Sequence, residues 1–346
     1  MKIDRIIATT LLLLLALAPG MALAEEVDIR QLGAEAAEYA MGEMGFERGD
    51  TDVLALTNAG YAVIGDQTTE ECLDAVMEVT GCTPGKGNLL NILSPPWKAL
   101  WFGFYDKKTG EAVYMKVKDD GTGYAIQEAE KIDAETVLAD VEGWNPGVFD
   151  HMLPVVNIWA HEKTPYIFMK AVELHDHLCP GVSSGFLLAR YMEKELPIED
   201  ATNQSYRVIA CPNWCKDDYF QMAWDCTPGK SGLFVKKMTA DETSALTEKF
   251  GTRVAGIFIR WDAASKTGDG LVLGFDFDKA TEMSNSEGWP RWAARLQQDI
   301  ILMDAADSPE TFVSTIKEFS LADEDELFAL QGAGVHPLKV LGVMSG

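Results

Sequence analysis

Histidine and cysteine are scarce in this chain of 346 residues, which has five of the first and six of the second. The first 150 residues contain no histidine, so that part of the chain cannot build an imidazole-containing metal site of its own. The chain has no Cys-x-x-Cys-His motif, which disfavours covalently attached haem. Its two Gly-Lys segments also lack the spacing of a phosphate-binding loop. Anion binding by Lys86 or Lys230 stays open beside a plain turn.

Basic residues are also few. The 29 Lys and Arg stand against 54 Asp and Glu, and the formal net charge is −25. Nucleic acids and anionic membranes both require basic surfaces, so the composition argues against either as a partner. We expect the partner to be a small molecule or a metal ligand.

Long apolar runs are confined to the start of the chain. Lys2 and Arg5 precede the apolar stretch 6–18, and Ala22-Leu23-Ala24 is a small-x-small cleavage signal. We therefore predict a signal peptide over residues 1–24 and an exported protein, located in the periplasm, outside the cell or at its surface. An uncleaved anchor is the alternative, but about a dozen apolar residues are few for a membrane span. We expect no membrane insertion after cleavage.

The few potential metal ligands are concentrated in two short segments. Residues 175–181 read His-Asp-His-Leu-Cys-Pro-Gly, and Cys211, Cys215 and Cys226 follow within 50 residues. Mixed nitrogen and sulfur donors suit zinc and other first-row divalent metals. We predict one such ion. The predicted ligands are His175, His177, Cys179 and Cys215.

Other interpretations of these residues stay open. The histidine segment could be a helix-capping turn with partly buried imidazoles. Cys211 could form a disulfide with Cys215, and Cys72 could form a disulfide with Cys82. We also expect several neighbours to support the ion or line a pocket, with an Asp orienting a ligand histidine. These neighbours are Asp176, Asp218, Cys226 and Trp214.

An internal repeat organises the chain. Cys82-Thr83-Pro84-Gly85-Lys86 recurs as Cys226-Thr227-Pro228-Gly229-Lys230. The second copy has an additional helical segment near 238–250. The flanking segments also correspond, namely 71–77 with 215–221, 60–64 with 205–209, and the hairpin patterns 99–117 with 254–277.

The repeat predicts two related domains, at 25–145 and 160–285, separated by the turn signal Asn145-Pro146-Gly147. Helical patterns alternate with paired strand patterns, which indicates an α+β fold with largely antiparallel sheets. We expect residues 286–346 to form a C-terminal helical extension and an irregular tail. Ser308-Pro309-Glu310 is a helix-start signal within that region.

These motifs together resemble the FmdE-like family, which is named after formylmethanofuran dehydrogenase. That family combines a His-x-His-x-Cys-Pro-Gly segment, a Cys-x-x-Asp-Ala segment and a Gly-Cys-Thr-x-Gly-Lys-Gly-Asn-Leu loop. The second domain has the first motif at 175–181 and a Cys-x-x-Asp at 215–218, whereas the first domain has the complete loop at 81–89. The resemblance implies an α+β fold, a zinc-type site and paired protomers, but no particular reaction.

Each copy has kept half of the family pattern. The first domain has Glu71 where the second has Cys215, so we expect it to be free of metal. This suggests an intramolecular pseudo-dimer with divided roles. The function is then either metal-assisted chemistry on a small molecule, or non-catalytic binding of a metal ion or a metal-bearing ligand. A fourth coordination position closed by Cys226 would favour a structural metal.

Overall fold

The computed structural model describes residues 27–118, 121–132 and 152–345. The predicted signal peptide and the predicted boundary turn at 145–147 lie outside these residues. No helix in the described ranges combines the length and apolar character needed to cross a membrane.

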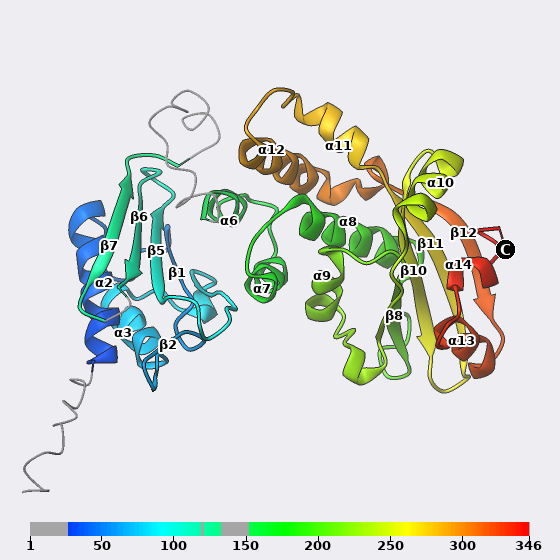
Figure 1. Cartoon of the computed structure of the whole chain (residues 1–346), viewed down its shortest axis with the longest axis horizontal. Coiled ribbons are helices and arrows are strands. Elements are labelled where there is room, and N and C mark those ends of the chain that lie inside the picture. The colour runs from blue at the N-terminus through cyan, green and yellow to red at the C-terminus, as the bar shows by residue number, and fades with distance from the viewer. Residues whose placement is uncertain (1–26, 119–120, 133–151, 346) are drawn as a thin grey trace, which may run out of the picture.

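Five strands form the sheet of the first repeat, in the order β4-β1-β5-β6-β7 (Figure 1). β1 and β4 run parallel, and the other neighbours are antiparallel. Successive residues of β1 face opposite sides, so Leu54 and Leu56 enter one core while Val53 and Ala55 enter another. The bounds are β1 Val53–Thr57, β4 Leu89–Asn91, β5 Trp101–Asp106, β6 Ala112–Val117 and β7 Tyr124–Ala129.

The second sheet repeats this topology strand for strand. Its order is β9-β8-β10-β11-β12, with β8 and β9 parallel and the others antiparallel. The predicted α+β class, the repeat and the largely antiparallel sheets are thus confirmed. The bounds are β8 Gln204–Ala210, β9 Leu233–Val235, β10 Arg253–Asp262, β11 Thr267–Phe275 and β12 Val313–Leu321.

A pair of helices accompanies each sheet. The pairs are α2 (Ile29–Met44) with α3 (Glu71–Thr80), and α8 (Pro180–Glu195) with α9 (Lys216–Ala223). Glycine permits close helix contact in both pairs. A Cβ on Gly33 would lie 2.7 Å from the Cys72 backbone, and one on Gly185 would lie 2.7 Å from the Lys216 carbonyl. Cys72 and Lys216 therefore occupy equivalent places.

Two sequence predictions need correction. The strand equivalent to β8 is β1, not residues 60–64, because the first copy inserts a small hairpin of β2 (Val63–Ile64) and β3 (Gln67–Thr68). The region 286–346 is only partly helical, since β12 pairs with β11 and completes the second sheet. Ser308-Pro309-Glu310 starts only the short 3-10 helix η4 (Pro309–Thr311) before that strand.

The remaining helices join the repeats or cover the second one. The predicted additional helix is α10, and a helical extension does follow the last strand as α13 and α14. The Gly-Lys loops occupy equivalent places as 3-10 turns, η1 and η2, each before the parallel edge strand. The bounds are α6 Met152–Trp159, α7 Tyr166–His175, α10 Ala240–Phe250, α11 Phe277–Ser284, α12 Arg291–Asp304, α13 Glu324–Gln331, α14 Pro337–Val340, η1 Pro84–Lys86, η2 Pro228–Lys230 and η3 Ala305–Asp307.

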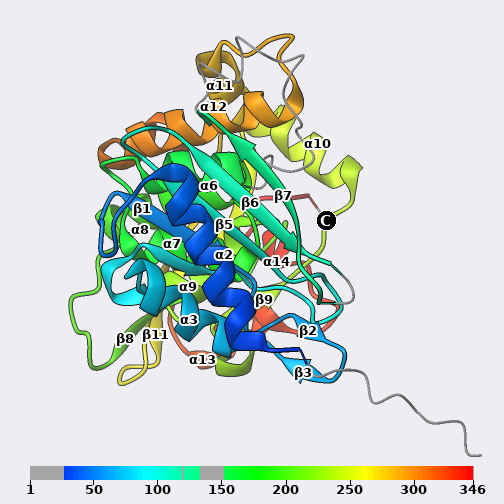
Figure 2. The same cartoon turned by 90° about the vertical axis from the view of Figure 1, so that its left-hand side faces the viewer.

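The two repeats do not meet through equivalent faces. Helices α2 and α3 cover the outer face of the first sheet, as Figure 2 shows, whereas α8 and α9 lie on the inner face of the second (Figure 1). Helices α10, α13 and α14 cover the outer face of the second sheet. A pseudo-twofold contact would bring equivalent faces together. The expected pseudo-dimer is instead a tandem arrangement, because α6 and α7 cover the bare apolar face of the first sheet.

Candidate metal centre

The histidine segment is a sharp connection between two helices. Helix α7 ends at His175, and Asp176 adopts a left-handed conformation with φ of 64° that turns the chain out of the helix. Cys179 is the N-cap residue of α8, and Pro180 occupies the first helical position. The loop between the helices therefore places His175 and Cys179 on either side of one turn.

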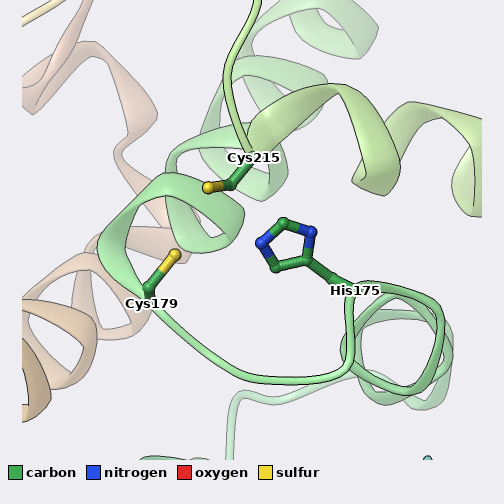
Figure 3. A group of neighbouring side chains, drawn as sticks. All are labelled: His175, Cys179 and Cys215. Carbon is green, nitrogen blue, oxygen red and sulfur yellow. The ribbon is translucent and has the colours of Figure 1, made fainter. Parts of the chain in front are cut away.

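The third side chain comes from the next helix. Cys215 is the N-cap residue of α9 and points toward the α7–α8 connection (Figure 3). Gly181 makes this approach possible, because a Cβ there would lie 2.8 Å from Cβ of Cys215. Behind Cys215, the buried Lys216 ammonium donates to Asp217 at 2.6 Å and to the Pro212 carbonyl at 3.1 Å. This buried pair holds the turn that leads into α9.

His175, Cys179 and Cys215 form a group whose ligand atoms all lie within 4.8 Å of one another. Donors around a tetrahedral zinc ion, with bonds of about 2.0–2.3 Å, are separated by roughly 3.3–3.8 Å. The observed separations exceed that range by about an ångström at most. An imidazole and two thiols are also a donor set that zinc and neighbouring metals prefer. The group could hold a metal ion.

The orientation of His175 fits that role. Its Nδ1 hydrogen-bonds the Asp218 carboxylate at 2.6 Å, and its Nε2 is buried without a hydrogen-bond partner among the described residues. A buried polar atom without a partner costs free energy, and an unpartnered nitrogen beside two thiols fits the role of a metal ligand. A carboxylate on the other ring nitrogen is the usual way in which a ligand imidazole is fixed.

The electrostatics of the cluster favour a protonated imidazole on His175 and a thiolate on Cys215. Burial alone would lower the pKa of His175, but its interactions with Asp218 and Cys179 raise it to about 9. The hydrogen bond from Cys179 lowers the pKa of Cys215 to about 7, against the opposing effect of burial. A thiolate is the form that binds metal. Cys215 is therefore prepared for ligation near neutral pH, while His175 must lose a proton first.

His177 lies beside the group but is not one of the three. Its Nδ1 hydrogen-bonds Asp176 at 2.5 Å, and its ring centroid is 4.5 Å from that of His175. Its interactions with Asp176 and then Cys179 raise its pKa to about 9. The two carboxylates predicted to orient a histidine thus bond to different rings. Asp218 bonds to His175, and Asp176 bonds to His177.

Cys226 and Trp214, two other predicted neighbours, have contacts of their own. Cys226 is buried behind β8, where its thiol contacts the Tyr206 carbonyl at 3.1 Å, and burial raises its pKa to about 12. The Trp214 ring donates to the Ser184 hydroxyl at 3.0 Å and packs between Lys216 and Arg253. Neither is in the three-residue group. All six cysteines are free thiols, so neither suggested disulfide is present.

The equivalent positions of the first repeat offer no such set. Val27 precedes Gly33 by the same number of residues as Cys179 precedes Gly185, and Glu71 stands where Cys215 stands in the second copy. Its thiols, Cys72 and Cys82, are buried in the core. In the described part of the chain, the group that could hold a metal ion belongs to the second repeat.

The metal loop, residues 175–179, is docked against the first repeat through the end of α7. The backbone N–H of Asn91 donates to the Glu173 carboxylate at 3.0 Å, and that of Leu93 donates to the Glu173 carbonyl at 2.9 Å. Trp159 also donates to the Gly87 carbonyl at 2.8 Å. The Glu173 bonds fix the end of α7, and the Trp159 bond fixes the end of α6, against the first repeat. A cavity of about 560 Å³ lies beside them, and Asp176 helps to line it.

Comparison with known families agrees with this architecture. The profile described as FmdE, molybdenum formylmethanofuran dehydrogenase operon, matches residues 30–140 and again 174–309. The chain belongs to the FmdE family. The two FmdE matches coincide with the two copies of the repeat, and the second includes the whole His/Cys group. No curated protein matches the chain. The FmdE assignment establishes the family but leaves the reaction unspecified.

Sequence reasoning missed the residues that the first repeat contributes near this FmdE site. Lys98, Trp101, Tyr114 and Lys116 line the cavity beside the metal loop. Two of them are lysines in a strongly acidic chain, but no motif connects them. Their proximity to the loop depends on how α6 and α7 place the second repeat against the first sheet.

Proposed function

We propose that this protein is an exported FmdE metalloprotein that binds one first-row divalent ion, preferentially zinc, in its second repeat. Its ligands are His175, Cys179 and Cys215, and a small molecule completes the coordination. The convergence of these three side chains around the unpartnered Nε2 of His175 is the observation on which the proposal rests. Export is supported by the charged start, apolar run and Ala-Leu-Ala signal of residues 1–24.

The donor set favours a ligand-binding ion over a purely structural one. Structural zinc sites have four protein ligands, whereas three ligands, including the Cys₂His set, are typical of catalytic sites. Cys226 does not supply a fourth ligand, because its buried thiol bonds to the Tyr206 carbonyl of β8. An ion held here would act as a Lewis acid toward a bound carbonyl or similar group.

The surrounding side chains have distinct tasks in this proposal. Asp218 keeps the proton of His175 on Nδ1, so that Nε2 faces the ion. His177 has a side chain that is 36% exposed, and its Nδ1 is held by Asp176. The ring also interacts with Cys179, so it lies where it can exchange a proton with a molecule bound at the ion.

Ligand capture without chemistry is the second candidate. The cavity beside the metal loop favours it, because 560 Å³ is in the range of small-molecule sites and Leu56, Ile92 and Met152 supply apolar lining. Both candidates require a coordination position that an external ligand can occupy, and they differ only in turnover.

Cobalt substitution tests the shared requirement. We expect Co²⁺-loaded protein to show a visible spectrum that shifts on saturable addition of azide, since azide would bind the fourth position. The Cys226→Ser protein serves as the control and should respond in the same way. A cobalt spectrum that azide leaves unchanged would mean that protein ligands close the site, and the proposal would be wrong.

A further inference from the structure

A cavity of about 560 Å³ lies on the first sheet, on the face opposite α2 and α3. Leu56, Ile92 and the α6 residues Met152 and Val155 form its apolar part. Gly103 lets α6 approach the sheet, because a Cβ there would lie 2.8 Å from Sδ of Met152. One end of this sheet face is therefore covered by α6, and the other end is left as the cavity.

A pair of aromatic rings forms one wall. Trp101 on β5 and Tyr114 on β6 are stacked, with ring centroids 5.7 Å apart and an interplanar angle of 27°. Both rings line the cavity and both are only partly buried. Exposed aromatic faces that lie side by side on a sheet are suited to flat, unsaturated molecules, which stack on them and displace water.

The charge of the lining is opposite to that of the whole protein. Lys98 and Lys116 line the cavity, and Asp176 is the only acidic residue that does so among those the structure describes. Neither lysine ammonium pairs with a carboxylate of the described residues, whereas the Asp176 carboxylate is bonded to His177. Two cations placed in this way, in a protein of net charge −25, indicate an anionic ligand.

We propose that this cavity binds a small molecule that combines a flat ring system with an anionic group, the ring on Trp101 and Tyr114 and the anion at Lys98 and Lys116. The aromatic and cationic side chains of this site come from the first repeat, and they do not require the metal. Because Asp176 also lines the cavity, the same molecule would lie beside the metal loop, and this last point rests on the proposed function.

Binding of matched probes tests the assignment. Calorimetric titration of the full mature chain should show saturable binding of 2-naphthoate, about fivefold or more tighter at low salt than neutral 2-naphthalenemethanol. The double variant Lys98→Gln/Lys116→Gln should lose that preference and keep the binding of the neutral probe. Lys118→Gln, which removes a nearby exposed lysine that does not line the cavity, is the matched control and should keep the preference.

Two outcomes would overturn the proposal. One is equal affinity of the wild-type protein for both probes, and the other is a preference for naphthoate that survives in the double variant. Repeating the titration with chelator-treated protein separates this site from the metal centre. Binding of 2-naphthoate should persist without metal. The cavity proposal would therefore hold even if the metal proposal failed. Binding that vanishes with the metal would contradict an origin in the first repeat.

Discussion

At the scale of single residues, the metal centre depends on which imidazole faces the thiols. His175 and His177 are two positions apart, and their spacing to Cys179 does not distinguish them. The difference comes from Asp218, which is distant in sequence and holds His175 with Nε2 toward the thiols. His177 is held by its own neighbour Asp176 at the edge of the loop.

The two histidines should therefore respond differently to substitution. We expect His175→Ala to remove most of the bound metal, because it deletes one of three ligands, whereas His177→Ala should retain most of it. Elemental analysis of the purified variants is the measurement. Cys179→Ser should behave like His175→Ala, and Cys82→Ser, which alters a core thiol of the first repeat, is the control. Metal loss in His177→Ala with retention in His175→Ala would reverse the assignment.

Asp218 should act through His175 without binding the ion itself. Asp218→Asn keeps the shape of the side chain but removes the charge that fixes the imidazole, so zinc affinity should fall by about 10–100-fold. Competition with a chromogenic chelator measures this change. Asp225→Asn, which removes an exposed carboxylate paired with Lys230, should leave the affinity unchanged. An unaltered affinity in Asp218→Asn would show that the observed hydrogen bond does not support the site.

Metal uptake should also depend on pH. The pKa of His175 is raised to about 9 in the metal-free protein, so below that pH a proton competes with the ion for the imidazole. Apparent zinc affinity should then increase by at least about tenfold for each pH unit between about 6 and 8. Titrations with the same chelator across this range provide the test, and an affinity that is flat with pH would contradict the protonated state assigned to His175.

Much of the site could be predicted at this scale. The short spacing of His, His and Cys before a Pro-Gly helix start indicates a chelate, and Cys215 follows from the second cysteine segment. The choice of imidazole could not be predicted, because it depends on the left-handed turn at Asp176 and on contact between α7 and α9. The place of the cavity lysines, Lys98 and Lys116, could not be predicted for the same reason. They become neighbours of the metal loop only through tertiary packing.

At the scale of elements, glycines set the distance between the paired helices. Gly33 and Gly185 are equivalent, and each faces the backbone of the following helix at a distance that leaves no room for a side chain. The second pair has an additional contact of this kind, because Gly181 faces Cys215. Close packing of α8 against α9 thus also places two of the three candidate metal ligands, Cys179 and Cys215.

Adding one methyl group tests this packing. Gly33→Ala and Gly185→Ala should each lower the free energy of unfolding by about 1–3 kcal/mol through overpacking. Gly42→Ala is the matched control on α2, where a Cβ meets nothing within 4 Å, and it should stabilise the protein by about 0.5–1 kcal/mol. Urea unfolding of the three variants measures these changes. A Gly185→Ala protein as stable as wild type would show that the helices have room to separate.

The elements themselves were predicted unevenly. Helix α8 follows from the Pro-Gly start and the apolar spacing after it, and the paired hairpins follow from their β-branched residues. Strand β12 was missed because the Ser-Pro-Glu signal before it is typical of a helix start. The strand forms instead because residues 313–321 pair along β11, a long-range contact that local helix propensity cannot reveal.

At the scale of the whole molecule, the two copies of the repeat carry different residues at equivalent places. The first copy has Val27 and Glu71 where the second has Cys179 and Cys215, and it contributes most of the cavity lining and the docking edge for α7. The repeat could be predicted from the duplicated Cys-Thr-Pro-Gly-Lys segment. The tandem packing could not, because it depends on α6, α7 and the helices that cover the second sheet.

A duplicated chain with a single metal site should bind a single ion. Elemental analysis of purified mature protein, expressed in metal-replete medium, tests this most directly. About one zinc-like ion per chain is the result that the structure predicts, since among the described residues only the second repeat brings an imidazole and two thiols together. Two ions per chain would show that the first repeat also binds metal, and none would show that the His/Cys group is not a metal site.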